Sequence, residues 1–265
     1  MEPSYSLGQR ALAETLGTAL LVLVGPGSVV ATLVLAGDAK PAITGSDLLG
    51  ISFAFGFIIT ALVYALGKVS GCHINPAVTF ALAATKRFPW RELPTYWAAQ
   101  VLGAVLGAFG IWALFTQTGI DLGMGQTSFN EATTSWGSAI FAEGIGTFML
   151  MLAILGIVDA RSPGDFAGIV IGGVVVAIIM VIGPVTGASL NPARAFGPEF
   201  VSALGGGATH WNQLLPVYIL PGLVGSGLAA FVYDFLATPR KIEAPIKAAV
   251  TTPDPGASGG VAAAK

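Results

Sequence analysis

Six stretches of this chain are long and apolar enough to cross a lipid bilayer, and two further apolar stretches are too short. A membrane-spanning helix needs about 20 mostly apolar residues. The long stretches lie near residues 10–36, 48–68, 94–116, 136–158, 166–183 and 212–236. The short ones lie near 76–86 and 192–203, enough for about half the hydrocarbon thickness. The pattern predicts an all-α integral membrane protein with six transmembrane helices and two re-entrant half-helices.

Composition agrees with a lipid environment. Hydrophobic residues make up 54% of the 265 residues and charged residues 10%, whereas soluble domains carry about 25% charged residues. The net charge of −2 argues against a nucleic-acid partner. One cysteine and two distant histidines predict no disulfide framework, metal site or cofactor. Since no arrangement of catalytic groups is evident, we do not expect an enzyme.

The same tripeptide opens both short stretches. Asn75-Pro76-Ala77 and Asn191-Pro192-Ala193 each follow a Gly-containing segment. Asn is a favoured helix N-cap, and Pro is favoured at the first helical position. A second motif, Ala-Glu-x-x-Gly-Thr, occurs at 13–18 and again at 142–147. Both observations indicate two related halves.

Each half reads span, span, loop, half-helix, span. Three spans are an odd number, so the second half must be inverted relative to the first. In inverted repeats, sites lie near the bilayer midplane at interrupted helices. We therefore expect one channel domain over 1–236, with repeats at approximately 8–116 and 136–236. The polar connection 117–135 links the halves on the external side, and the Pro- and Ala-rich segment 237–265 should be a disordered cytoplasmic tail.

Basic residues predict the orientation, because Lys and Arg are enriched in cytoplasmic loops. One side of the predicted topology carries most of them: Arg10, Lys68, Lys86, Arg87, Arg91, Arg161, Arg240, Lys241 and Lys247. Lys40 and Arg194 fall on the other side. We expect a multi-pass protein of the cell membrane with both termini in the cytoplasm.

Several polar side chains lie inside the apolar pattern. Asn75 and Asn191 lie where a loop becomes a half-helix, so their amides can donate to a passing oxygen beside two positive helix N-termini. Their alternative role is to cap those helices. Arg194 is a functional candidate because an intramembrane charge is expensive, although an Arg there can also pair structurally, with Glu199 as the nearest acid. Glu14 and Glu143 lie within spans, where isolated carboxylates mark polar networks or proton pathways.

On these motifs the chain resembles the aquaporin (major intrinsic protein) family over about residues 8–236. The strings from Ser70 to Val78 and from Gly187 to Gly197 carry the resemblance. It implies that Arg194 forms one wall of an external constriction, that Glu14 and Glu143 brace the half-helix loops, and that the protein is a homotetramer. It further implies a single file of loop carbonyls along the pore from Gly71, Cys72, His73, Gly187, Ala188 and Ser189.

The family's spacing places three further walls of the constriction at Phe55, Ile179 and Ala188. Strict water channels of the family have His where this chain has Ile179. Glycerol channels have Trp in the second span, an aromatic residue in the loop, and Asp where this chain has Ala195. The mixed set of Phe55, Ile179, Ala188 and Arg194 is most similar to that of the archaeal M-type aquaporins.

The resemblance and the residues together predict a passive water channel that excludes protons and ions, with glycerol or other small neutral solutes as further permeants. A glycerol-selective facilitator is the first alternative. The second is a secondary transporter or ion channel, which needs a coupling-ion site or a ring of acids at the midplane. Only Glu14 and Glu143 are available for such a site.

Overall fold

The computed structural model describes residues 5–37 and 42–238. Within these ranges the chain is helical, with no strand. Most of the predicted tail lies outside the described residues, since they end at position 238, and so do Lys40, Arg240, Lys241 and Lys247. The all-α membrane fold with six apolar helices is confirmed.

The six spans and two half-helices follow the predicted order. The long helices are α1 (Leu7–Ala36), α2 (Gly45–Ser70), α4 (Leu93–Asp121), α5 (Trp136–Val158), α6 (Ala167–Thr186) and α9 (Leu220–Ala237). The half-helices are α3 (Pro76–Ala84) and α7 (Pro192–Leu204). The sixth span begins with α8 (Trp211–Gln213) and the π-helical η4 (Leu214–Ile219), and 3-10 turns occupy η1 (Trp90–Glu92), η2 (Gly123–Gly125) and η3 (Gly164–Phe166).

Most helix ends differ from the predicted ranges by one to three residues, and two differences have a clear cause in the backbone. Helix α4 continues to Asp121, so the predicted polar connection at 117–135 begins as helix. The continuation follows a kink at Thr116, whose φ of 53° is non-helical. Helix α3 ends at Ala84, two residues before the predicted end, because Lys86 has a φ of 61° that no helix accommodates.

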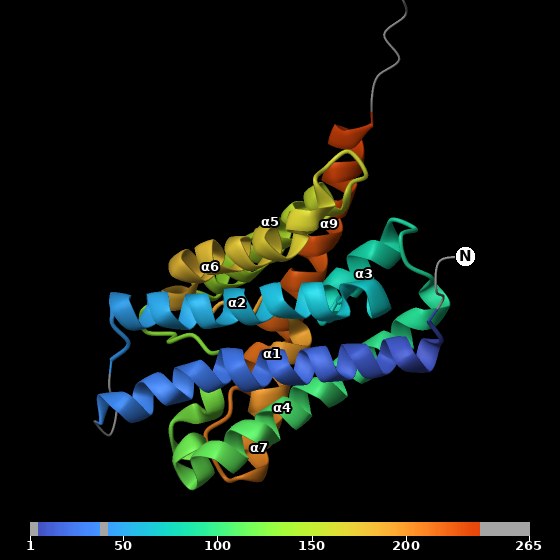
Figure 1. Cartoon of the computed structure of the whole chain (residues 1–265). Coiled ribbons are helices and arrows are strands. Elements are labelled where there is room, and N and C mark those ends of the chain that lie inside the picture. Colours follow the sequence, from blue (N-terminus) through green and yellow to red (C-terminus); the bar gives the residue numbers. More distant parts are fainter. Residues whose placement is uncertain (1–4, 38–41, 239–265) are drawn as a thin grey trace, which may run out of the picture.

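Each half-helix packs against a long helix of the other half. Helix α1 lies along α4 and α2 in the first half, and α5 lies along α9 and α6 in the second (Figure 1). Helices α2 and α6 pack against each other across the halves. Half-helix α3 packs on α9 of the second half, and α7 packs on α4 of the first. Both half-helices are therefore enclosed by spans from both repeats.

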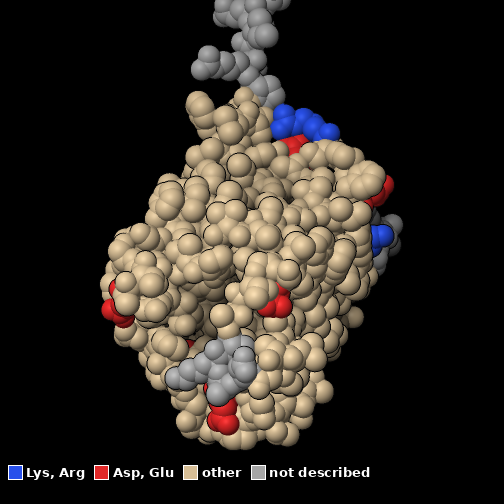
Figure 2. Space-filling model, turned by 90° about the vertical axis from the view of Figure 1, so that its left-hand side faces the viewer, with Lys and Arg blue, Asp and Glu red and all other residues tan. Residues whose placement is uncertain are grey.

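Charged side chains collect at one end of the bundle, where α1 begins and α9 ends. Arg10 pairs with Glu92 at 2.7 Å between Nη1 and Oε2, and Arg87 pairs with Asp234. The Asp159 carboxylate accepts hydrogen bonds from Arg161 and Tyr233, which hold its pKa below the usual range. Figure 2 looks onto the opposite end, where scattered acidic side chains lie and Lys and Arg are seen only at the edge.

Candidate functional site

The two half-helices meet tip to tip through their capping Asn residues. The Oδ1 of Asn75 accepts from the Ala77 amide at 2.9 Å, and the Oδ1 of Asn191 accepts from the Ala193 amide at 3.0 Å. The Nδ2 of Asn75 donates to the Leu190 carbonyl at 2.7 Å, and the Nδ2 of Asn191 donates to the Ile74 carbonyl at 2.8 Å. Each amide therefore caps its own helix and bonds the opposite loop.

Capping and donation thus occur together and are not alternatives. Sequence reasoning did not foresee that one hydrogen of each Nδ2 would be taken by the opposite loop. An amide nitrogen carries two hydrogens, so one remains on each side chain for another acceptor. Both Asn residues line a cavity, which gives these remaining donors access to a small polar molecule.

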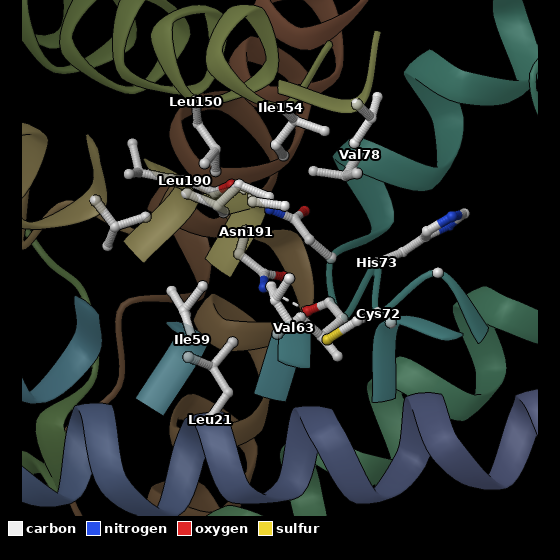
Figure 3. A pocket seen from close by; sticks show the side chains of 18 of the residues that line it. Leu21, Ile59, Val63, Cys72, His73, Val78, Leu150, Ile154, Leu190 and Asn191 are labelled. Atoms are coloured by element: carbon white, nitrogen blue, oxygen red, sulfur yellow. Dashed lines mark hydrogen bonds between the residues drawn. The ribbon is translucent and has the colours of Figure 1, made fainter. Parts of the chain in front are cut away.

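That cavity is long and has a volume of about 600 Å³. It begins among Tyr64, Lys68 and Asp165 at the charged end of the bundle and runs past the Asn pair. Leu21 and Ile59 lie on one side of it, and Leu150 and Ile154 lie on the other (Figure 3). Apolar side chains of the spans therefore face the cavity from two sides, whereas backbone and amide groups line the loop side.

The four residues expected in the constriction all line this cavity: Phe55, Ile179, Ala188 and Arg194. Of the six residues expected to present loop carbonyls, Gly71, Cys72, His73, Ala188 and Ser189 line it. Gly187 is not among the lining residues; it forms the left-handed C-cap of α6 with a φ of 79°.

Arg194 is buried without an acidic partner. Its side chain donates from Nη1 to the Gly125 carbonyl at 3.0 Å, and its Cζ lies 5.3 Å from the centroid of the Phe55 ring. Its Nε has no hydrogen-bond partner among the described residues. Glu199, the nearest acid in sequence, accepts from the His210 amide instead. The guanidinium charge at the cavity wall is therefore not neutralised by an ion pair within the described chain.

Glu14 joins α1 to the loop before α3. Its Oε1 accepts from the Ser70 hydroxyl at 2.7 Å and from the His73 amide at 2.9 Å. Its Oε2 accepts from the Ile74 amide at 2.6 Å and from the Gln100 side chain at 2.8 Å. All the protons come from the partners, so both carboxylate oxygens of Glu14 act as acceptors.

Glu143 does the same in the second half. Its Oε1 accepts from the Thr186 hydroxyl at 2.6 Å and from the Ser189 amide at 2.9 Å. Its Oε2 accepts from the Leu190 amide at 2.8 Å. Two intramembrane carboxylates therefore bind the loops from behind, and neither is a lining residue of the cavity.

These contacts stabilise an unusual backbone. Cys72 and Ile74 have φ of 48° and 42°, and Ala188 and Leu190 have φ of 46° and 55°. Such conformations cost about 1–3 kcal/mol each for residues other than Gly. The backbone amides of both loops donate to these carboxylates, which holds the left-handed residues in place.

Steric contacts explain why glycine occupies the fifth position of the Ala-Glu-x-x-Gly-Thr motif. A Cβ on Gly17 would lie 2.7 Å from the Ile74 side chain, and one on Gly146 would lie 2.5 Å from the Leu190 side chain. Only Gly leaves room for the strained loop residue. Each copy of the motif therefore supplies a carboxylate that accepts from the loop amides and a glycine that leaves space for the loop side chain.

Several contributors were not found from the sequence. The Gly125 carbonyl that holds Arg194 belongs to the connection between the halves, where no motif marks it. Tyr96 and Tyr218 donate to the carbonyls of Ser70 and Thr186 at 2.8 and 3.0 Å. The two tyrosines occupy matching places in the two repeats, so an alignment of the halves is the signal that can find them.

Two half-helices that meet inside a bundle of six apolar helices, beside a long cavity with polar groups along one wall, define a membrane channel. The comparisons agree with this class. The model of the major intrinsic protein family matches residues 3–233, and the chain belongs to that family, whose members are channels and not enzymes.

Relatives among known proteins are similar over most of the chain. Aquaporin AqpM of Methanothermobacter marburgensis is 44% identical over 249 residues, which cover 88% of this chain and 99% of the relative. A probable aquaporin AqpM of Archaeoglobus fulgidus is 44% identical over 245 residues, with the same coverage. The likeness to archaeal M-type aquaporins is therefore confirmed.

A solved structure supports the fold independently. The aquaglyceroporin from Plasmodium falciparum superposes with a TM-score of 0.77 at 29% identity. The superposition covers 88% of this chain and 98% of that one.

Proposed function

We propose that the protein is a passive water channel that excludes protons and ions and also passes small neutral solutes. The single observation that carries this is the pair of cross-bonded Asn tips beside a continuous cavity. Its archaeal relatives, named aquaporins, support the same function. No energy source is required, since solutes move down their own gradients.

Protons are excluded by orientation and charge. A proton hops along a chain of waters only if each water can donate to the next in one direction. The remaining Nδ2 hydrogens of Asn75 and Asn191 donate to the central water oxygen, so its own hydrogens point outward and the chain is interrupted. The N-termini of α3 and α7 add positive potential at the same level.

Phe55, Ile179, Ala188 and Arg194 form the selectivity filter. Arg194 offers donors to a passing oxygen and repels cations, and the other three walls carry no side-chain hydrogen-bonding group. Glu14 and Glu143 brace the loops that present the carbonyls. Because the filter lacks a second polar side chain, a solute less polar than water loses little by replacing water there.

The channel lies in the cell membrane with its charged end in the cytoplasm. The described basic side chains outside the filter gather at that end, which agrees with the enrichment of Lys and Arg in cytoplasmic loops. A homotetramer in which each subunit has its own pore is the assembly that the family membership favours.

Swelling of liposomes that contain the purified protein tests this function. Against an impermeant osmolyte, we expect water flux well above that of empty liposomes. A glycerol gradient then separates the water channel from a glycerol facilitator. The second function is tested because the similar solved structure is that of an aquaglyceroporin. Current across the same bilayer, or solute accumulation against its gradient, would contradict the proposal and favour an ion channel or transporter.

Changing Ile179 to His tests the assignment of the filter. The side chain is 4% exposed and lines the cavity, so an imidazole there adds a hydrogen-bonding group and reaches further from the backbone. We expect Ile179→His to lower glycerol flux by about tenfold or more while water flux continues, because pore diameter and lining groups set selectivity. The buried neighbour Ile178, which does not line the cavity, is the matched control as Ile178→Val. Undiminished glycerol passage in Ile179→His would remove Ile179 from the filter.

A further inference from the structure

The ring of Phe55 lies directly against a glycine of α1. A Cβ built on Gly25 would lie 2.4 Å from Phe55 Cε1 and 2.7 Å from both Cδ1 and Cζ. Carbon atoms that are not bonded pack at about 3.5–4.0 Å. The ring therefore occupies the space that a side chain at position 25 would fill. Phe55 lines the cavity, whereas Gly25 does not.

The ring also has a neighbour on the cavity wall. The Arg194 guanidinium carbon lies 5.3 Å from the ring centroid, and both residues line the cavity. The ring is thus confined between the backbone of α1 and the conduit. Displacement away from Gly25 has to carry it toward the open space that solutes use.

The next residue of α1 packs against the glycine whose carbonyl holds Arg194. Gly125, whose carbonyl accepts from Arg194 Nη1, has a φ of 64°. A Cβ on Gly125 would lie 2.2 Å from the Pro26 carbonyl oxygen, so its backbone packs directly on α1. One turn of α1 therefore positions both the aromatic wall and the cationic wall.

We propose that Gly25 is a specificity-determining residue: its missing side chain is the recess that sets how far the Phe55 ring projects into the cavity, and hence the width of the filter. This inference rests on the proposed function of the filter. It places a determinant of solute size in α1, outside the four residues that line the constriction. Two channels with the same four lining residues would then differ in size limit if their residues at this position differed.

The test is Gly25→Ala in the full chain, reconstituted in liposomes and assayed with water, urea and glycerol. The ring has to move by roughly 1 Å to restore a normal contact. We expect the largest solute that the wild type passes to lose about tenfold in permeability, which corresponds to about 1.4 kcal/mol of added barrier. Smaller solutes should lose less, so the ratio between solutes changes.

Gly27→Ala is the matched control. It lies on the same helix and raises helix propensity equally, but its Cβ would meet only Ile111, at an ordinary 3.6 Å. We expect wild-type permeabilities for it. The double variant Gly25→Ala with Phe55→Leu should regain the lost permeability and folding, because the smaller side chain clears the new methyl group.

Two results overturn the inference: an unchanged solute ratio in folded Gly25→Ala, or an equal change in Gly27→Ala. If Gly25→Ala does not fold, the comparison moves to the Phe55→Leu background, where adding Gly25→Ala has to leave the ratio unchanged. A wild type that passes none of the three solutes would instead overturn the proposed function.

Discussion

Replacing Arg194 by Val is expected to admit cations while water still passes. The guanidinium is 2% exposed, without an acidic partner in the described chain, and lies at the cavity wall. A cation about 5 Å from it meets a repulsion of about 3 kcal/mol at an effective dielectric constant of about 20. Loss of that repulsion corresponds to an increase in cation leak on the order of a hundredfold. Val also removes a large side chain, so water flux should be maintained or increased.

The leak is measured as dissipation of a sodium or proton gradient in the liposomes used for water flux. Arg194→Lys is the matched control, because it keeps the charge and a donor. We expect its leak to stay near that of the wild type. If Arg194→Val excludes ions as well as the wild type does, the charge at this position is not the barrier, and the helix N-termini at Asn75 and Asn191 carry the exclusion alone.

The fold could be predicted from the sequence because a segment that crosses a bilayer has to be long, apolar and helical. The membrane-spanning helices are recognised by their length and apolar composition. Asn-Pro at 75–76 and 191–192 combines an N-cap residue with a residue favoured at the first helical position. Those signals are local. The tip-to-tip bonds between Asn75 and Leu190 and between Asn191 and Ile74 join residues more than a hundred positions apart, and no local pattern specifies them.

The same distinction explains what the site prediction missed. Arg194 stands out in sequence because a charge among apolar residues is rare. Its hydrogen-bond partner does not, because the Gly125 backbone carbonyl is a group that every residue has. Nothing in the sequence marks Gly25 as functional either, since glycine is common in membrane helices. The role proposed for Gly25 depends on its contact with the Phe55 ring, and that contact is seen only in the folded structure.

Loss of the Glu143 carboxylate should have the largest effect on both folding and transport. Glu143→Gln keeps the size of the side chain but supplies only one oxygen. Whichever way the amide is turned, its NH₂ group faces the backbone amide of either Ser189 or Leu190, and that buried donor is left unpaired at about 1–3 kcal/mol. One of the two amide contacts that hold the strained backbone around Leu190 is lost in either orientation, so the loop should relax.

Relaxation of the loop moves the Leu190 carbonyl, which accepts from Asn75, and this is how a residue outside the cavity should reduce transport. We expect Glu143→Gln to lower both the thermal unfolding midpoint in detergent and the water flux per folded protein, the flux by about tenfold or more, since about 1.4 kcal/mol of barrier is tenfold. Glu199→Gln is the matched control: this buried acid accepts one backbone amide, from His210, which an amide oxygen can also do. Wild-type water flux in folded Glu143→Gln would show that the loop holds its shape without the carboxylate, and that the strained carbonyls are stabilised by packing against Gly146 and its neighbours alone.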